Sequence, residues 1–133
     1  MNYNAFKNEL RNYYSYLKSV DEIREEIELI HYEMTGVKGI RYDREPSSFN
    51  PELSEEKKLE LIEEKEEKEL ELRFTLNAIN LIEKKISKLS PGDKDACLKI
   101  IAEGISYEDV SRSKGYSKGG MWKRIRRELT KIL

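Results

Sequence analysis

The chain has 133 residues, of which 38% are charged and 38% are hydrophobic, and it contains only seven glycines and three prolines. This length fits one ordinary domain, or a small domain with an accessory helical segment, and it excludes two large catalytic domains. High charge with little Gly and Pro is typical of long solvated helices. We therefore expect an all-α fold.

The cellular compartment is indicated by what the sequence lacks. The apolar stretches are too short to span a membrane, and the first residues, MNYNAFKNEL, do not have the basic and apolar regions of a secretory signal. A single cysteine, Cys97, has no partner for an internal disulfide. We expect a cytoplasmic protein that does not contact a membrane.

The net charge of −1 conceals an uneven distribution of charge along the chain. Residues 1–89 carry 15 basic and 20 acidic side chains, whereas residues 90–133 carry 10 and 6. The last 23 residues alone hold eight basic side chains and one acidic side chain. Such a basic end predicts binding to a polyanion.

Two helices are predicted at the amino-terminal end. Apolar residues at spacings of three and four predict the first helix from Asn4 to about Lys18. Ser19 and Glu22 have the spacing of a capping box, which predicts a second helix that starts there and stops near Gly36. Together these helices would form a helical hairpin.

The segment 35–51 interrupts every periodic pattern and contains two glycines and two prolines, so it is predicted to be a loop. It is basic, because it carries Lys38, Arg41 and Arg44. Two roles fit this composition: packing back onto the hairpin, which a loop of this length favours, and contact with a partner.

A long helix is predicted from Pro51 or Ser54 to Leu89. Its apolar residues recur at near-heptad spacing, at Leu59, Ile62, Leu72, Leu76, Ile79, Ile82, Ile86 and Leu89. Residues 63–69, EEKEEKE, interrupt this seam and are expected to form a solvated face with ion pairs between adjacent turns. The seam fits packing within the chain and pairing in a homodimer equally well.

Three further helices are expected between residues 90 and 133. Ser90, Ser106 and Ser117 each stand where a side-chain hydroxyl would cap a helix start. Gly104 and Gly115 stand just after the ends of the first two helices. The chain is therefore predicted to contain two parts, with residues 1–89 for packing or dimerisation and residues 90–133 for binding.

The segment 90–133 has the spacing of a helix-turn-helix. A small residue at Ser111, a glycine at Gly115 and an apolar residue at Met121 meet its requirements for helix crossing, turn and core. On the last helix, the apolar side is formed by Met121, Ile125, Leu129 and Ile132, and the opposite side by Gly119, Lys123, Arg126, Arg127 and Thr130. This is the pattern of a recognition helix, whose basic side faces phosphates and base edges in the major groove.

Residues 89–133 resemble the region 4 helix-turn-helix of sigma-70-type transcription factors. The resemblance is carried by the segment EG-x-SYEDV from Glu103 to Val110, by GYSKGGM from Gly115 to Met121, and by Arg124-Ile125. It implies that residues at and just after the helix cap contact DNA, namely Ser117, Lys118, Gly119, Gly120, Trp122 and Lys123. Four further contacts are expected from positive charge on the last helix, at Arg124, Arg126, Arg127 and Lys131. Of these, Arg124, Arg127 and Lys131 are expected on phosphates.

Nearly the full length of the chain also resembles the small phage transcriptional regulators of the ArpU/RinA type. This second resemblance is carried by the helices before the helix-turn-helix and by the motif TGVKGIRYD leading to Glu45-Pro46. It implies activation of late phage genes. Because no equivalent of sigma region 2 is visible, autonomous promoter opening is not expected.

We predict a sequence-specific transcriptional regulator that binds double-stranded DNA. Two alternatives stay open: a sigma-like protein that docks onto RNA polymerase, and a subunit of the small-terminase type that recognises DNA for packaging. The chain has one histidine, His31, and one cysteine, Cys97, too few for a metal cluster or a Cys-His catalytic pair. We therefore expect no enzyme activity, no cofactor and no metal.

Overall fold

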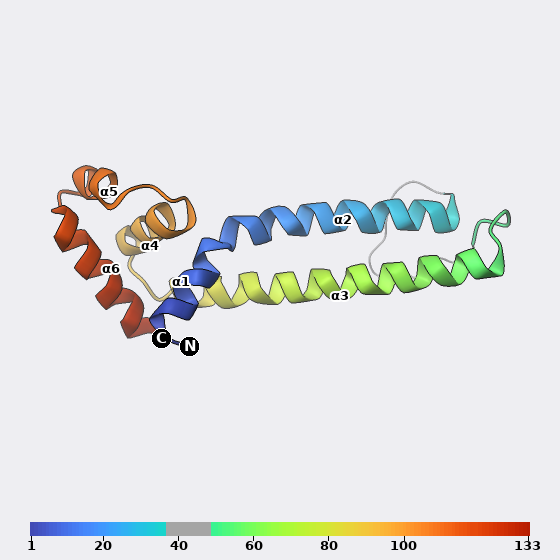
Figure 1. Ribbon diagram of the computed structural model, residues 1–133, viewed down its shortest axis with the longest axis horizontal. Coiled ribbons are helices and arrows are strands. Elements are labelled where there is room, and N and C mark those ends of the chain that lie inside the picture. The colour runs from blue at the N-terminus through green and yellow to red at the C-terminus, as the bar shows by residue number, and fades with distance from the viewer. Residues whose placement is uncertain (37–48) are drawn as a thin grey trace. The chain divides into compact units, whose positions relative to one another are not determined.

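The computed structural model describes residues 1–36 and 49–133, and every regular element in these two ranges is a helix (Figure 1). The elements are α1 (Tyr3–Arg11), α2 (Tyr13–Thr35), α3 (Glu55–Ile86), α4 (Pro91–Cys97), the π-helical segment η1 (Leu98–Ala102), α5 (Tyr107–Lys114) and α6 (Lys118–Ile132). This confirms the predicted all-α fold. None of these helices is both long and apolar enough to cross a membrane. The basic residues Lys38, Arg41 and Arg44 of the predicted loop lie outside the described ranges.

The chain forms two compact units, and each is described by itself. One unit contains Met1–Leu17 and Asn77–Leu133, and the other contains Lys18–Leu76. The helix-turn-helix is thus part of a larger unit than the predicted segment 90–133. The reason is that residues of α1 and of the end of α3 enter the same core as residues of α6.

The core of the first unit is built from α1, the end of α3 and the four elements that follow. Phe6 and Leu10 of α1 are completely buried, as are Ile82 of α3 and Leu129 of α6. The buried members of this core are Phe6, Leu10, Ile82, Ile86, Leu89, Ala96, Cys97, Ile100, Ile101, Val110, Met121, Ile125 and Leu129. Contact of α1 with both η1 and α6 makes the first helix an integral part of this unit.

The predicted start of a second helix at Ser19 is wrong, because α2 runs through Ser19 without interruption. The break between α1 and α2 falls instead at Asn12, whose side-chain amide donates to the carbonyl of Asn8 at 3.1 Å. In α2 the buried residues Val20, Ile23, Ile27, Ile30 and Met34 keep one helical phase from the region of Ser19 to the end of the helix. This continuous phase overrides the local capping pattern at Ser19.

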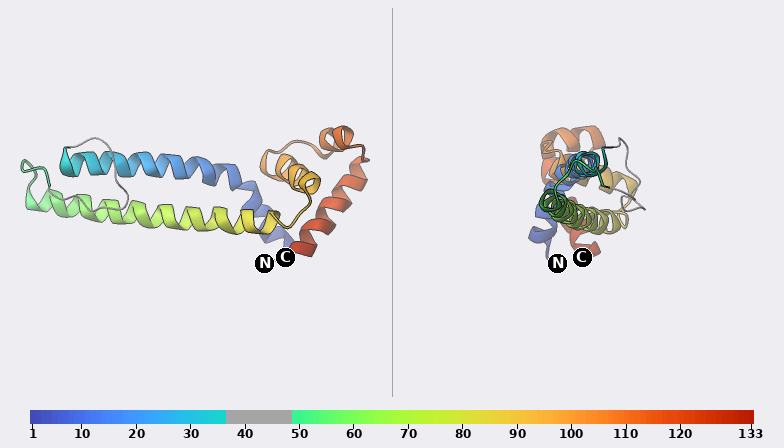
Figure 2. Two further views of the ribbon diagram at one scale, coloured as in Figure 1. Left: turned by 180° about the vertical axis from the view of Figure 1, so that it is seen from behind. Right: turned by 90° about the vertical axis from the view of Figure 1, so that its right-hand side faces the viewer.

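In the second unit, α2 and α3 run side by side in opposite directions (Figures 1 and 2). A buried cluster of Ile30, Met34 and Leu61 joins them. Leu61 has no exposed surface, whereas Leu59, the predicted seam residue, is 61% exposed. The prediction was therefore wrong by two positions at the start of this seam, and the seam packs within the chain here.

The charged stretch 63–69 is more than a solvated face. The Lys68 ammonium lies 2.6 Å from a carboxylate oxygen of Glu26 on α2. Lys65 also forms an ion pair with Glu69 on the next turn, and its side chain is only 12% exposed. Lysine stems therefore cover the interface between the two helices where the apolar residues of α3 stop.

Candidate nucleic-acid interface

The frame of the helix-turn-helix is set by local capping, as predicted. The Ser106 hydroxyl accepts a hydrogen bond from the backbone N–H of Asp109 at 3.1 Å, and the Ser117 hydroxyl accepts one from Gly120 at 3.0 Å. Between the two helices, Gly115 has φ of +78° and ψ of 21°, a left-handed conformation that strains any residue with a Cβ. These three positions fix where α5 begins and ends and where α6 begins.

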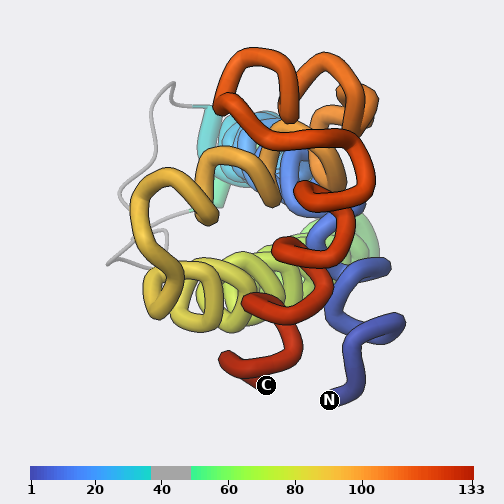
Figure 3. Tube along the Cα trace, turned by 90° about the vertical axis from the view of Figure 1, so that its left-hand side faces the viewer, coloured from blue at the N-terminus to red at the C-terminus, as the bar shows by residue number. Residues whose placement is uncertain are grey.

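One side of α6 is held in the core. Met121, Ile125 and Leu129 are buried to 1% exposure or less, which confirms the predicted apolar side. At the crossing of α5 and α6, the buried Ser111 donates its hydroxyl to the carbonyl of Glu108 at 2.9 Å, so its polar atom is satisfied. In Figure 3, α6 lies in the foreground and descends toward the carboxyl terminus.

Arg124 is engaged inside the unit. Its Nε donates to Oδ1 of Asp93 at 2.7 Å, and its Nη2 donates to Oδ2 at 3.2 Å. Burial acts to raise the pKa of Asp93, but hydrogen bonds from Arg124 and Ser90 together outweigh it, and the pKa is lowered. Arg124 thus ties α6 to α4, and the predicted contact with a DNA phosphate would have to break this pair.

A second ion pair ties α5 to α4. The Lys114 ammonium lies 2.9 Å from Oδ2 of Asp95, and Lys99 approaches the same oxygen at 3.2 Å. Hydrogen bonds from Lys114 and Lys99 lower the pKa of the Asp95 carboxyl. Together with Arg124 and Asp93, these contacts fix the positions of α5 and α6 on α4.

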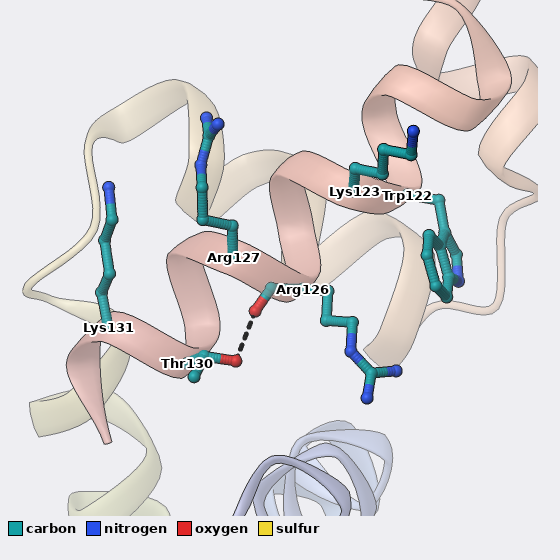
Figure 4. A pocket seen from close by; sticks show the side chains of 6 residues that line it. All are labelled: Trp122, Lys123, Arg126, Arg127, Thr130 and Lys131. Atoms are coloured by element: carbon teal, nitrogen blue, oxygen red, sulfur yellow. Dashed lines mark hydrogen bonds between the residues drawn. The ribbon is translucent and has the colours of Figure 1, made fainter.

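The outward side of α6 carries two parallel rows of side chains (Figure 4). One row contains Lys123, Arg127 and Lys131, and the other contains Trp122, Arg126 and Thr130. In Figure 4 the three cations of the first row extend to one side of α6, whereas Arg126 extends to the other. An open hollow of about 450 Å³ lies between the rows and is lined by all six residues. We call these six residues the basic face of α6.

The cations of the basic face differ in how they are paired. Arg127 and Lys131 each lie 3.2 Å from Glu128, the one acidic residue of α6, and both cationic side chains are 61% exposed. Pairs this exposed are weak and exchange readily for other anions. Lys123 and Arg126 of the basic face, and also Lys118 at the start of α6, have no carboxylate at ion-pair distance within the described ranges.

Some of the residues predicted to contact DNA from Ser117 onward shape the start of α6, and others lie on its accessible surface. A Cβ on Gly120 would lie 2.8 Å from the Ser117 hydroxyl, so this glycine leaves room for the helix cap. A Cβ on Gly119 would meet nothing within 4 Å, and the side chains of Lys118 and Trp122 are exposed. Lys118, Gly119 and Trp122 therefore belong to the accessible surface, and Ser117 and Gly120 shape its start.

Sequence reasoning missed one residue that lies against the basic face, Tyr3 of α1. The guanidinium carbon of Arg126 is 5.0 Å from the centre of the Tyr3 ring and 5.7 Å from the Trp122 ring. Tyr3 precedes the predicted start of the first helix, and no short-range pattern connects residue 3 with residue 126. Only the shared core of α1 and α6 brings them together.

The described ranges contain no group of three or more His, Cys, Asp or Glu side chains that could hold a metal ion. Cys97 is completely buried, and burial raises the pKa of its thiol to about 12. His31 lies half-buried on α2.

Comparison of the chain with family models, with curated proteins and with solved structures finds no match.

Proposed function

We propose that this protein is a sequence-specific regulator of transcription that binds double-stranded DNA through α6. The observation that carries the proposal is the basic face, which is turned outward while Met121, Ile125 and Leu129 hold the opposite side of the helix in the core. A helix fixed in this way, with cations and a bare glycine on its free side, has the features of a recognition helix in the major groove.

The contacts are assigned from position along α6. Lys118 and Lys123 lie in its amino-terminal half, where a recognition helix contacts base edges, and Gly119 between them allows a close approach of the backbone. Arg126, Arg127 and Lys131 lie toward the carboxyl end and bind phosphates. DNA phosphates displace Glu128 from its exposed pairs with Arg127 and Lys131.

The resemblance to the ArpU/RinA-type regulators supports a finer assignment, to a phage or prophage activator of late genes that acts in the cytoplasm. A single helix-turn-helix reads a short site, so useful affinity favours binding of two copies to two half-sites. The ion pairs of Arg124 with Asp93 and of Lys114 with Asp95 support binding through α6, because they hold α6 and α5 on α4 before DNA arrives.

The test is the salt dependence of binding, measured by fluorescence anisotropy on labelled duplex DNA. Neutralising about five phosphates gives a slope of roughly −4.5 in log–log form and a loss of several-hundredfold in affinity between about 50 and 200 mM salt. K123A/R127A should abolish specific binding without changing helicity. The matched control, K18A/R24A on α2, should bind like the wild type. A salt-insensitive affinity, or an unaffected K123A/R127A, would refute the proposal.

A further inference from the structure

The amino-terminal helix α1 carries a short cationic row of its own. Tyr3, Lys7 and Arg11 recur at intervals of four, so they lie along one side of this helix. The Lys7 ammonium lies 5.9 Å from the centre of the Tyr3 ring, and the Arg126 guanidinium lies 5.0 Å from the same centre. The two charges are therefore no more than 10.9 Å apart, and the row on α1 continues the basic face of α6.

The position of α1 beside α6 is fixed by packing. Phe6 and Leu10 are completely buried in the core shared with α6. The Asn2 side chain caps α1 by accepting a hydrogen bond from the backbone N–H of Ala5 at 2.8 Å. The Tyr3 hydroxyl interacts with that of Tyr107 at the start of α5, and burial raises the pKa of both. The helix that carries Lys7 and Arg11 is thus held in place by packing and capping.

In the part of the chain that the structure describes, the cations of α1 have no local counter-charge. Within residues 1–36 and 49–133, no carboxylate lies at ion-pair distance from Lys7 or Arg11. Glu9, the one acidic residue of α1, instead accepts a hydrogen bond from the Tyr16 hydroxyl at 3.0 Å. The Lys7 and Arg126 charges are at most slightly more than one Debye length apart, which is about 8–10 Å near physiological salt, so together they produce a joint positive potential that favours a polyanion.

Figures 3 and 4 show how the two helices relate. In Figure 3, α1 lies alongside the carboxyl-terminal half of α6. In Figure 4, Arg126 extends from α6 toward the blue ribbon of the amino-terminal segment, away from Lys123, Arg127 and Lys131. Arg126 therefore lies between the two cationic rows and joins them into one surface.

We infer that α1 is a second DNA-contact element, in which Lys7 and Arg11 bind backbone phosphates beside the groove that α6 occupies. This inference rests on the proposed function, because it assumes that α6 holds the duplex. Phosphate contacts of this kind position the protein on DNA and are independent of sequence. Tyr3 acts as a positioning residue that holds Arg126 between the two rows.

The test compares salt slopes of three double variants on fluorescein-labelled duplex DNA of mixed sequence. K7A/R11A should lower the magnitude of the slope by about 2, since each lost phosphate contact removes about 1. K7R/R11K keeps both charges and should keep the wild-type slope. K18A/R24A removes the same charge from α2 in the other unit and should also leave the slope unchanged. Thermal unfolding of each variant, followed by circular dichroism, shows that the helices are intact.

The outcomes separate the inference from the proposed function. If the wild type binds and K7A/R11A behaves like K18A/R24A, the role of α1 is refuted while the role of α6 stands. If the salt slope of K7R/R11K falls as much as that of K7A/R11A, the effect is not one of charge and the inference is again refuted. If the wild type does not bind duplex DNA, the proposed function fails, and the inference fails with it.

Discussion

Arg124 of α6 and Asp93 of α4 form a two-point contact, with N–H···O distances of 2.7 and 3.2 Å. The same Asp93 carboxylate accepts a hydrogen bond from the Ser90 hydroxyl at 3.0 Å. A basic residue near the middle of α6 is thereby occupied in holding that helix on its unit. The basic residues of α6 consequently fall into two groups: Arg124, which is held by a carboxylate of α4, and the others, whose side chains are exposed.

The first prediction separates these groups by mutation. R124A should lower the midpoint of thermal unfolding, because the Asp93 carboxylate loses two charged hydrogen bonds, and it should leave the salt slope of DNA binding unchanged. R126A should leave the midpoint of thermal unfolding unchanged and lower the magnitude of the salt slope by about 1. Equal losses of slope in both variants would show that Arg124 also contacts DNA.

The second prediction concerns acid. The pKa values of Asp93 and Asp95 are lowered in the folded protein, so the unfolded chain binds more protons near its own carboxyl pKa of 3.8. The stability that these groups contribute is present above that pH and is lost as the pH falls through the lower pKa of the folded state. Chemical denaturation at several pH values should show this loss, and D93N/D95N should be less stable at neutral pH with a shallower acid decline. An unchanged acid decline in D93N/D95N would contradict the assignment.

The third prediction uses the helix cap at Ser117. S117A removes the acceptor for the Gly120 N–H and should reduce the free energy of unfolding by about 1 kcal/mol. S117D keeps a capping oxygen and should keep the stability, but it places a negative charge at the proposed DNA-binding surface and should weaken binding. Thermal unfolding and anisotropy measured on both variants separate the two effects. Wild-type DNA affinity in S117D would place this end of α6 outside the interface.

The fourth prediction concerns the packing of α3 on α2. L61A should cost about 2–5 kcal/mol of unfolding free energy, because Leu61 has no exposed surface and packs against Ile30 and Met34. L59A, two positions away on the exposed side, should change it by less than about 0.5 kcal/mol. Urea denaturation of the two variants checks this. A larger loss of unfolding free energy in L59A than in L61A would contradict this packing and support the seam predicted from the sequence.

Sequence predicts best the features that depend on local chemistry. Ser106, Gly115 and Ser117 mark helix ends through contacts made within four residues, so their roles are readable from spacing alone. The buried side of α6 is equally readable, since Met121, Ile125 and Leu129 follow the helical period. The helix-turn-helix frame was therefore predicted correctly.

Features that depend on distant contacts were missed. Sequence spacing does not connect Arg124 with Asp93, which lies 31 residues away, or Arg126 with Tyr3 at the other end of the chain. The seam shift from Leu59 to Leu61 has a related cause, because the charged stretch after Ile62 leaves the helical phase of α3 undefined. At these positions the fold of the whole unit decides the role of a residue.

The central claim is that the basic face of α6 recognises a particular DNA sequence, and selection of bound duplexes from a random pool tests it most directly. The wild type should enrich one motif over successive rounds, and K123A/R127A should enrich none. The spacing of repeated motifs would also report whether two copies bind together. A wild type that enriches no motif, or a K123A/R127A variant that enriches the same motif equally well, would contradict the account.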